Sequence, residues 1–100
     1  MHNAVSVAEL TIGLMLALAR HIPAADADTK AGGWQRAAFT GTELYGKTLG
    51  VLGLGRIGFL VARRAHALGM RVLAHDAYAN PDHPMVLESG ARLVDADTLL

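Results

Sequence analysis

Three glycines follow a short apolar run in the middle of the chain, and their spacing constrains the fold more than any other feature. Residues 48–52 are followed by Gly53, Gly55 and Gly58, in the pattern Gly-x-Gly-x-x-Gly. In a strand–turn–helix unit that binds a dinucleotide, the first glycine allows a tight turn. The second lets the backbone approach a pyrophosphate, and the third lets the helix pack closely on the strand. The pattern therefore predicts a phosphate-binding turn between a strand and a helix.

The residues after the glycines support this interpretation. Apolar side chains recur at helical spacing between Arg56 and Leu68, and Gly69 stands where a glycine would end that helix. A second strand is predicted at residues 71–75, and Asp76 follows it directly. An acidic side chain at this place accepts hydrogen bonds from the adenosine ribose and repels a 2′-phosphate. We therefore expect NAD rather than NADP as the cofactor.

The first helical residues after the turn complete the predicted cofactor site. The N–H groups of Arg56 and Ile57 would point from a helix N-terminus at the phosphates, where unpaired donors and the helix dipole favour negative charge. Two roles stay open for the Arg56 side chain, namely contact with the pyrophosphate and a cap on the loop. The predicted cofactor-binding residues are Gly53, Gly55, Arg56, Ile57, Gly58 and Asp76.

The predicted elements indicate an α/β protein with a partial, Rossmann-type parallel sheet and flanking helices. A short helix is expected at residues 84–89, a third strand at 91–94, and a helix from Ala96 with Asp95 as its N-cap. A complete dinucleotide fold commonly has six strands in the order 3-2-1-4-5-6. Because three strands are predicted, we expect residues 34–100 to be the first half of an NAD-binding domain, in a fragment of a larger protein.

The first third of the chain predicts two helices, and the first of them lacks a polar face. Ser6 and Glu9 have the spacing of a capping box, which places the start of a long apolar helix at Ser6 and its end near His21. Such a helix is covered either by the core of its own domain or by another domain or subunit, and both alternatives stay open. Pro23 either breaks this helix or opens a second one at its first position. Residues 1–33 are therefore expected to form interdomain or dimer-interface helices.

Composition excludes several classes of function. The 100 residues include nine basic and nine acidic side chains and no cysteine. The charges form no basic patch for nucleic acid, and the lack of thiols fits a cytoplasmic protein. The longest uncharged apolar run, residues 10–19, is too short to cross a bilayer. Five scattered histidines without i,i+4 spacing predict no metal site. No catalytic residue is predicted in this chain. The aromatic residues Trp34 and Phe39 are expected to be packing anchors.

Four segments resemble the D-isomer-specific 2-hydroxyacid dehydrogenases, namely residues 3–10, 19–25, 33–34 and 39–58. The last segment is most similar to the branch of that family that oxidises 3-phosphoglycerate for serine synthesis. The resemblance implies an NAD-dependent oxidoreductase that transfers a hydride between a D-2-hydroxy acid and NAD. It also implies that Arg56 and Ile57 contact the pyrophosphate and that Asp76 holds the ribose.

The same resemblance implies how the rest of the protein is organised. The helix from Ser6 to Ile22 would link a substrate domain to the nucleotide domain and lie near a homodimer interface. The family's catalytic arginine, glutamate and histidine would lie beyond Leu100, so the fragment is expected to bind NAD weakly and to catalyse nothing. Ala77 departs from the family, which often has proline there. The alternative function is an NAD-sensing, corepressor-like interaction protein of the same fold.

Overall fold

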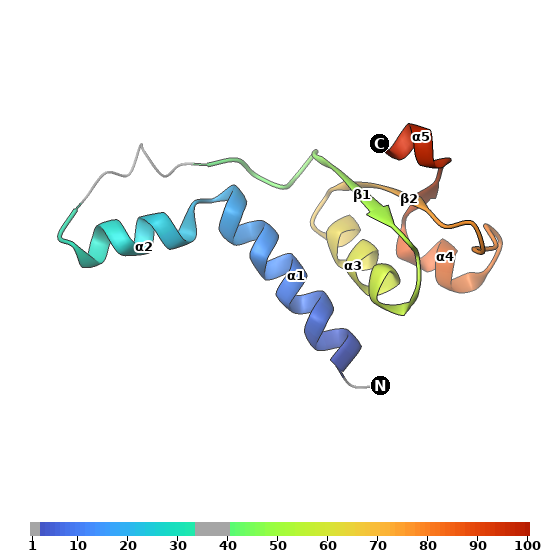
Figure 1. Cartoon of the computed structure of the whole chain (residues 1–100), viewed down its shortest axis with the longest axis horizontal. Helices are drawn as coiled ribbons and strands as arrows, with labels where there is room; N and C mark the ends of the chain where they lie inside the picture. The colour runs from blue at the N-terminus through green and yellow to red at the C-terminus, as the bar shows by residue number, and fades with distance from the viewer. Residues whose placement is uncertain (1–2, 34–40) are drawn as a thin grey trace.

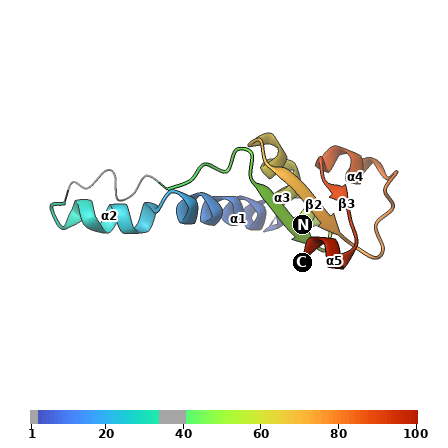
Figure 2. The same cartoon turned by 90° about the horizontal axis from the view of Figure 1, so that it is seen from above.

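The computed structural model describes residues 3–33 and 41–100, so the predicted anchors Trp34 and Phe39 lie outside the described residues. The elements are α1 (Asn3–Ala19), α2 (Ile22–Lys30), β1 (Thr48–Leu52), α3 (Arg56–Ala67), β2 (Arg71–His75), α4 (Pro84–Ser89), β3 (Arg92–Leu93) and α5 (Ala96–Leu99). Figures 1 and 2 show a compact α/β part at one end and an arm formed by α1 and α2. The arm explains a radius of gyration of 16.1 Å, against about 13 Å for a compact domain of this length.

The three strands form one parallel sheet in the order β1-β2-β3. The register pairs Thr48 with Arg71 and Leu52 with His75 between β1 and β2, and Leu73 with Arg92 between β2 and β3. Within the described residues, the other edge of β1 has no partner strand. This arrangement is the 3-2-1 half of a dinucleotide fold. The prediction of a partial, Rossmann-type parallel sheet is therefore confirmed, although β3 is shorter than predicted.

Helices lie on both faces of the sheet, and one face holds the core. Val72 and Ala74 alternate with more exposed residues along β2 and are buried beneath α3, whose Ala62 and Ala65 are fully buried. Small side chains on α3 allow the helix to approach the strands closely. On the opposite face, Leu99 of α5 lies over Gly50 of β1. Because helices pack on both of its faces, the sheet holds the turns that follow β1 and β2 in fixed positions at its carboxyl edge.

Helix α1 begins earlier than the sequence predicts. The helix already includes Asn3, so Ser6 lies inside it and the predicted capping box is wrong. The physical reason is tertiary packing: Ala4 and Ala8 are buried where α1 packs on α3, and this contact extends the helix before the local capping signal. At its other end α1 stops at Ala19, because His21 adopts a positive φ of 55° before α2 starts.

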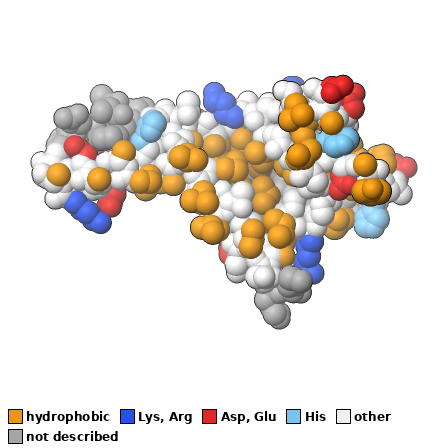
Figure 3. All heavy atoms as spheres, viewed as in Figure 1, with side chains coloured by type: hydrophobic (Ala, Val, Ile, Leu, Met, Phe, Trp, Pro, Cys, Tyr) orange, Lys and Arg blue, Asp and Glu red, His pale blue; other side chains and the backbone are white. Residues whose placement is uncertain are grey.

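One side of α1 is apolar and exposed. Leu10, Leu14 and Leu18 follow one another at i, i+4 spacing and are 62%, 56% and 76% exposed. Figure 3 shows hydrophobic side chains gathered over the part of the surface that α1 forms. Among the described residues, no single helix is long and apolar enough to cross a membrane, and α1 with α2 would reach that length only as a pair bent by 63°. We call Leu10, Leu14 and Leu18 the leucine stripe.

Candidate functional site

The glycine turn after β1 has the geometry that its first glycine predicts. Gly53 adopts a φ of 91°, a conformation that side chains with a Cβ rarely take. Its N–H donates to the His75 carbonyl over 2.8 Å, which ties the end of β1 to the end of β2. Gly53 therefore turns the chain sharply at the carboxyl edge of the sheet.

Gly58 provides the close contact between α3 and β1. A Cβ at this position would clash with the Gly53 carbonyl oxygen and would lie 3.3 Å from the Val51 side chain. The missing side chain is therefore what lets the first turn of α3 sit against the end of the strand. The predicted structural role of the third glycine is present in the fold.

The first turn of α3 presents free backbone donors beside open space. The first hydrogen bond of the helix runs from the Phe59 N–H to the Gly55 carbonyl over 2.8 Å, so the N–H groups of Arg56 and Ile57 precede it and have no acceptor within the helix. Gly55 is the N-cap, and a Cβ there would meet no atom within 4 Å. This backbone can be approached closely by an anion, as the sequence predicts for a pyrophosphate.

A cavity of about 540 Å³ opens in front of this turn. Its walls are the loop residues Gly53, Gly55, Arg56, Ile57 and Gly58 together with Asn3, Ala4 and Val7 of α1. The sequence predicts an interface role for α1 but not that its first turn lines the same cavity as the glycines. No local signal reveals this, because the two segments are fifty residues apart in the sequence and only the α1–α3 packing brings them together.

Asp76 lies on the other side of the turn. Its Oδ2 accepts the Leu54 N–H over 2.8 Å, and its Oδ1 accepts the Tyr78 N–H over 2.9 Å. These bonds, from Tyr78 and then Leu54, lower the pKa of the Asp76 carboxyl below 3.8, and nearby His75 contributes in the same direction. Asp76 therefore carries a negative charge at neutral pH, directly beside the glycine turn.

A second cavity, of about 240 Å³, extends from Asp76 along the loop that precedes α4. We call it the Asp76 cavity, and its lining residues are Leu54, Asp76, Tyr78, Ala79, Asn80, His83, Met85 and Val86. The sequence predicts a loop here and a surface role for His83. The structure gives that side chain a definite role, because its Nδ1 accepts the Met85 N–H over 3.1 Å and caps α4. The turn and the two cavities together could hold an elongated, negatively charged ligand.

The predicted N-cap of α5 is also present at the carboxyl edge of the sheet. Asp95 caps α5, because its Oδ1 accepts the Thr98 N–H over 2.7 Å, and the hydrogen bonds from Thr98 lower the pKa of this carboxyl.

Within residues 3–33 and 41–100, no cluster of three or more histidine, aspartate or glutamate side chains could hold a metal ion. His75 contacts the Val94 carbonyl oxygen through Nδ1 over 3.0 Å. The contacts of the six predicted cofactor residues with a ligand stay predictions.

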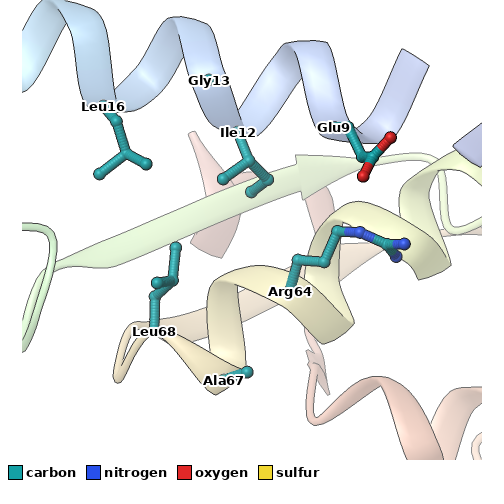
Figure 4. A pocket seen from close by; sticks show the side chains of 7 residues that line it. All are labelled: Glu9, Ile12, Gly13, Leu16, Arg64, Ala67 and Leu68. Atoms are coloured by element: carbon teal, nitrogen blue, oxygen red, sulfur yellow. The ribbon is translucent and has the colours of Figure 1, made fainter. Parts of the chain in front are cut away.

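A further cavity, between α1 and α3, is separate from this site. Figure 4 shows Glu9, Ile12 and Leu16 of α1 on one side of this cavity and Arg64 and Leu68 on the other. The volume of the cavity is about 460 Å³. Its walls are mostly apolar, and it lies away from the glycine turn and Asp76. It therefore has no part in the candidate cofactor site.

Comparison with known proteins agrees with this geometry. Residues 12–100 match the family described as "D-isomer specific 2-hydroxyacid dehydrogenase, NAD binding domain". The chain is 53% identical over 98 residues to D-3-phosphoglycerate dehydrogenase of Archaeoglobus fulgidus, covering 98% of this chain and 18% of that protein. It is 56% identical over 94 residues to the enzyme of the same name from Methanocaldococcus jannaschii, covering 93% and 17%. The chain thus spans less than a fifth of the length of these relatives.

Solved structures show the same fold. The apo-structure of D-lactate dehydrogenase from Escherichia coli superposes with a TM-score of 0.87 at 38% identity, covering 99% of this chain and 30% of that one. D-lactate dehydrogenase from Aquifex aeolicus, in complex with NAD and lactic acid, gives a TM-score of 0.82 at 35% identity over 95% of this chain and 28% of that one. With the glycine turn and the family match, these likenesses identify the chain as a member of the NAD-binding domain family of the D-isomer-specific 2-hydroxyacid dehydrogenases.

Proposed function

We propose that this chain is the first half of the NAD-binding domain of a D-3-phosphoglycerate dehydrogenase. The full protein would transfer a hydride between 3-phosphoglycerate and NAD in the cytoplasm, as a step of serine synthesis. The observation that carries the proposal is the pairing of an open glycine turn with the charged Asp76 carboxylate across it. The choice of 3-phosphoglycerate is supported by the names of the relatives that are 49–56% identical.

The residues present fit an NAD molecule along the turn. Gly53, Gly55 and Gly58 would leave room for the pyrophosphate, and the N–H groups of Arg56 and Ile57 would donate to it. Asp76 would accept hydrogen bonds from the adenosine ribose, and its charge would repel the 2′-phosphate of NADP. When bound, NAD supplies the hydride acceptor, while the side chains of this chain hold and orient it. The groups that act on the substrate would belong to other parts of the protein.

The arm formed by α1 and α2 would have a separate role. We propose that residues 1–33 link the nucleotide domain to a substrate domain and lie at a homodimer interface, with residues 34–100 as the first half of the NAD-binding domain. The leucine stripe supports this proposal, because three leucines in a row on one helix face are costly to leave in water. No observation favours the corepressor alternative.

Turnover and cofactor selectivity test the proposal. The protein at the length that its gene encodes should reduce NAD with 3-phosphoglycerate as substrate, and a corepressor would not. Replacing Asp76 with Ala should weaken NADH binding about tenfold or more, since hydrogen bonds to a charged group are among the strongest. The same change should relax discrimination against NADPH. Unchanged selectivity would contradict the ribose assignment, and a protein that binds neither cofactor would refute the proposed function.

A further inference from the structure

The hydrogen bond that caps α4 selects one neutral tautomer of a histidine beside the cofactor site. The backbone N–H of Met85 can only donate, so the Nδ1 atom of His83, 3.1 Å away, must be an unprotonated acceptor. A neutral imidazole carries its single proton on the other nitrogen. The Nε2 atom of His83 is therefore an N–H donor, and the fold selects this tautomer before any ligand arrives.

His83, the residue that carries this donor, is part of the wall of the Asp76 cavity. His83 lines the cavity together with apolar side chains of Leu54, Met85 and Val86 and with the carboxylate of Asp76. If Asp76 holds the ribose, the group next to the ribose in the cofactor is adenine, a flat base with apolar faces and several acceptor nitrogens. Apolar side chains and a donor at His83 match the chemistry of such a base, and the polar side chains of Tyr78 and Asn80 line the same cavity.

We propose that His83 binds the adenine of the cofactor, with its Nε2–H donating to an acceptor nitrogen of the base. This inference rests on the proposed function, because it places the ribose at Asp76. It adds a binding residue to the predicted set, which consists of the glycine-turn residues and Asp76. The same ring has two roles, since its Nδ1 caps α4 while its Nε2 binds the base.

Replacement of His83 by Asn separates the two roles. The Asn oxygen can accept the Met85 N–H, and Asn is among the best N-cap residues, so α4 should remain folded. The Asn side chain is too short to place a donor where Nε2 lies. The matched control is Glu88→Gln, because Glu88 is exposed on the same helix and does not line the cavity. Affinities for NADH and for ADP-ribose are measured by calorimetry on the protein at its encoded length.

We expect His83→Asn to weaken NADH and ADP-ribose binding by the same factor, about three- to tenfold, as for loss of one hydrogen bond. Glu88→Gln should leave both affinities unchanged. Equal losses for the two ligands would exclude the nicotinamide as the group affected, because ADP-ribose lacks only nicotinamide. Wild-type affinity in His83→Asn would overturn the inference while leaving the proposed function intact. Failure of the wild-type protein to bind NADH would overturn both.

A measurement on the wild-type protein alone provides a second test. The ¹⁵N chemical shifts of the His83 ring distinguish the two neutral tautomers. A proton on Nε2 in the ligand-free protein supports the inference, and a proton on Nδ1 refutes it whatever the variants show.

Discussion

The contact between Gly58 and the glycine turn makes a quantitative prediction about stability. A Cβ at Gly58 would lie closer than 3.0 Å to the carbonyl oxygen of Gly53, and backbone cannot move aside as a flexible side chain would. Gly58→Ala must therefore push the first turn of α3 away from β1. Forcing an extra carbon into a packed site costs about 1–3 kcal/mol. Replacing a helical glycine by alanine returns up to about 1 kcal/mol.

The expected net effect is a loss of about 1–2 kcal/mol in the free energy of unfolding. Urea denaturation monitored by circular dichroism measures it directly. Gly55→Ala is the matched control, because Gly55 has a φ of −81° and a Cβ there would meet no atom within 4 Å. This variant should unfold like the wild type, yet bind NADH more weakly if the backbone at Gly55 approaches the pyrophosphate.

The pair of variants can refute the reasoning in two ways. A Gly58→Ala protein as stable as the wild type would show that Gly58 of α3 does not lie in close contact with the Gly53 carbonyl oxygen. A Gly55→Ala protein with unchanged NADH affinity would show that the cofactor stays away from that part of the loop. The first result would concern the fold and the second the site, so neither can be mistaken for the other.

Other parts of the structure support three further predictions. Gly53→Ala should lower stability by about 1–2 kcal/mol in thermal unfolding, because Gly53 has a φ of 91° and strain rather than crowding opposes the side chain. Leu14→Glu should reduce self-association in analytical ultracentrifugation, since the charge would fall in the middle of the leucine stripe; an unchanged association constant would exclude this face as the interface. The pKa values of Asp76 and Asp95 lie below 3.8 in the folded protein, so their contribution to stability is complete above pH 3.8 and is lost as the pH falls through the lower folded values. Denaturation midpoints in acid should therefore depend less on pH in Asp76→Asn than in the wild type.

The central strand–turn–helix–strand unit could be predicted because its signals are local. The positive φ at Gly53, the close contact at Gly58 and the acid after β2 each depend on residues a few positions away, and the structure contains all three features. The N-caps of α4 and α5 lie where the sequence places the helix starts. Local chemistry decides such features, so the order of the amino acids is enough to predict them.

Features that depend on long-range packing could not be predicted in the same way. The capping box at Ser6 is locally plausible, but burial of Ala4 and Ala8 against α3 outweighs it and starts the helix earlier. The same contact brings Asn3 to the cavity in front of the glycine turn. Nothing near Asn3 in the sequence indicates that position, since it results from two helices packing across half the chain.

Asp76 links the stability of the loop to the recognition of the cofactor. A carboxylate has about four lone-pair positions, and the N–H groups of Leu54 and Tyr78 occupy two of them. Two positions are therefore free for the two hydroxyls of a ribose. Because the Leu54 N–H lies within the glycine turn, removing the carboxylate would loosen the loop as well as the ribose contact. A change of preference from NAD to NADP therefore needs a residue at position 76 that still accepts a hydrogen bond from Leu54 but carries no negative charge.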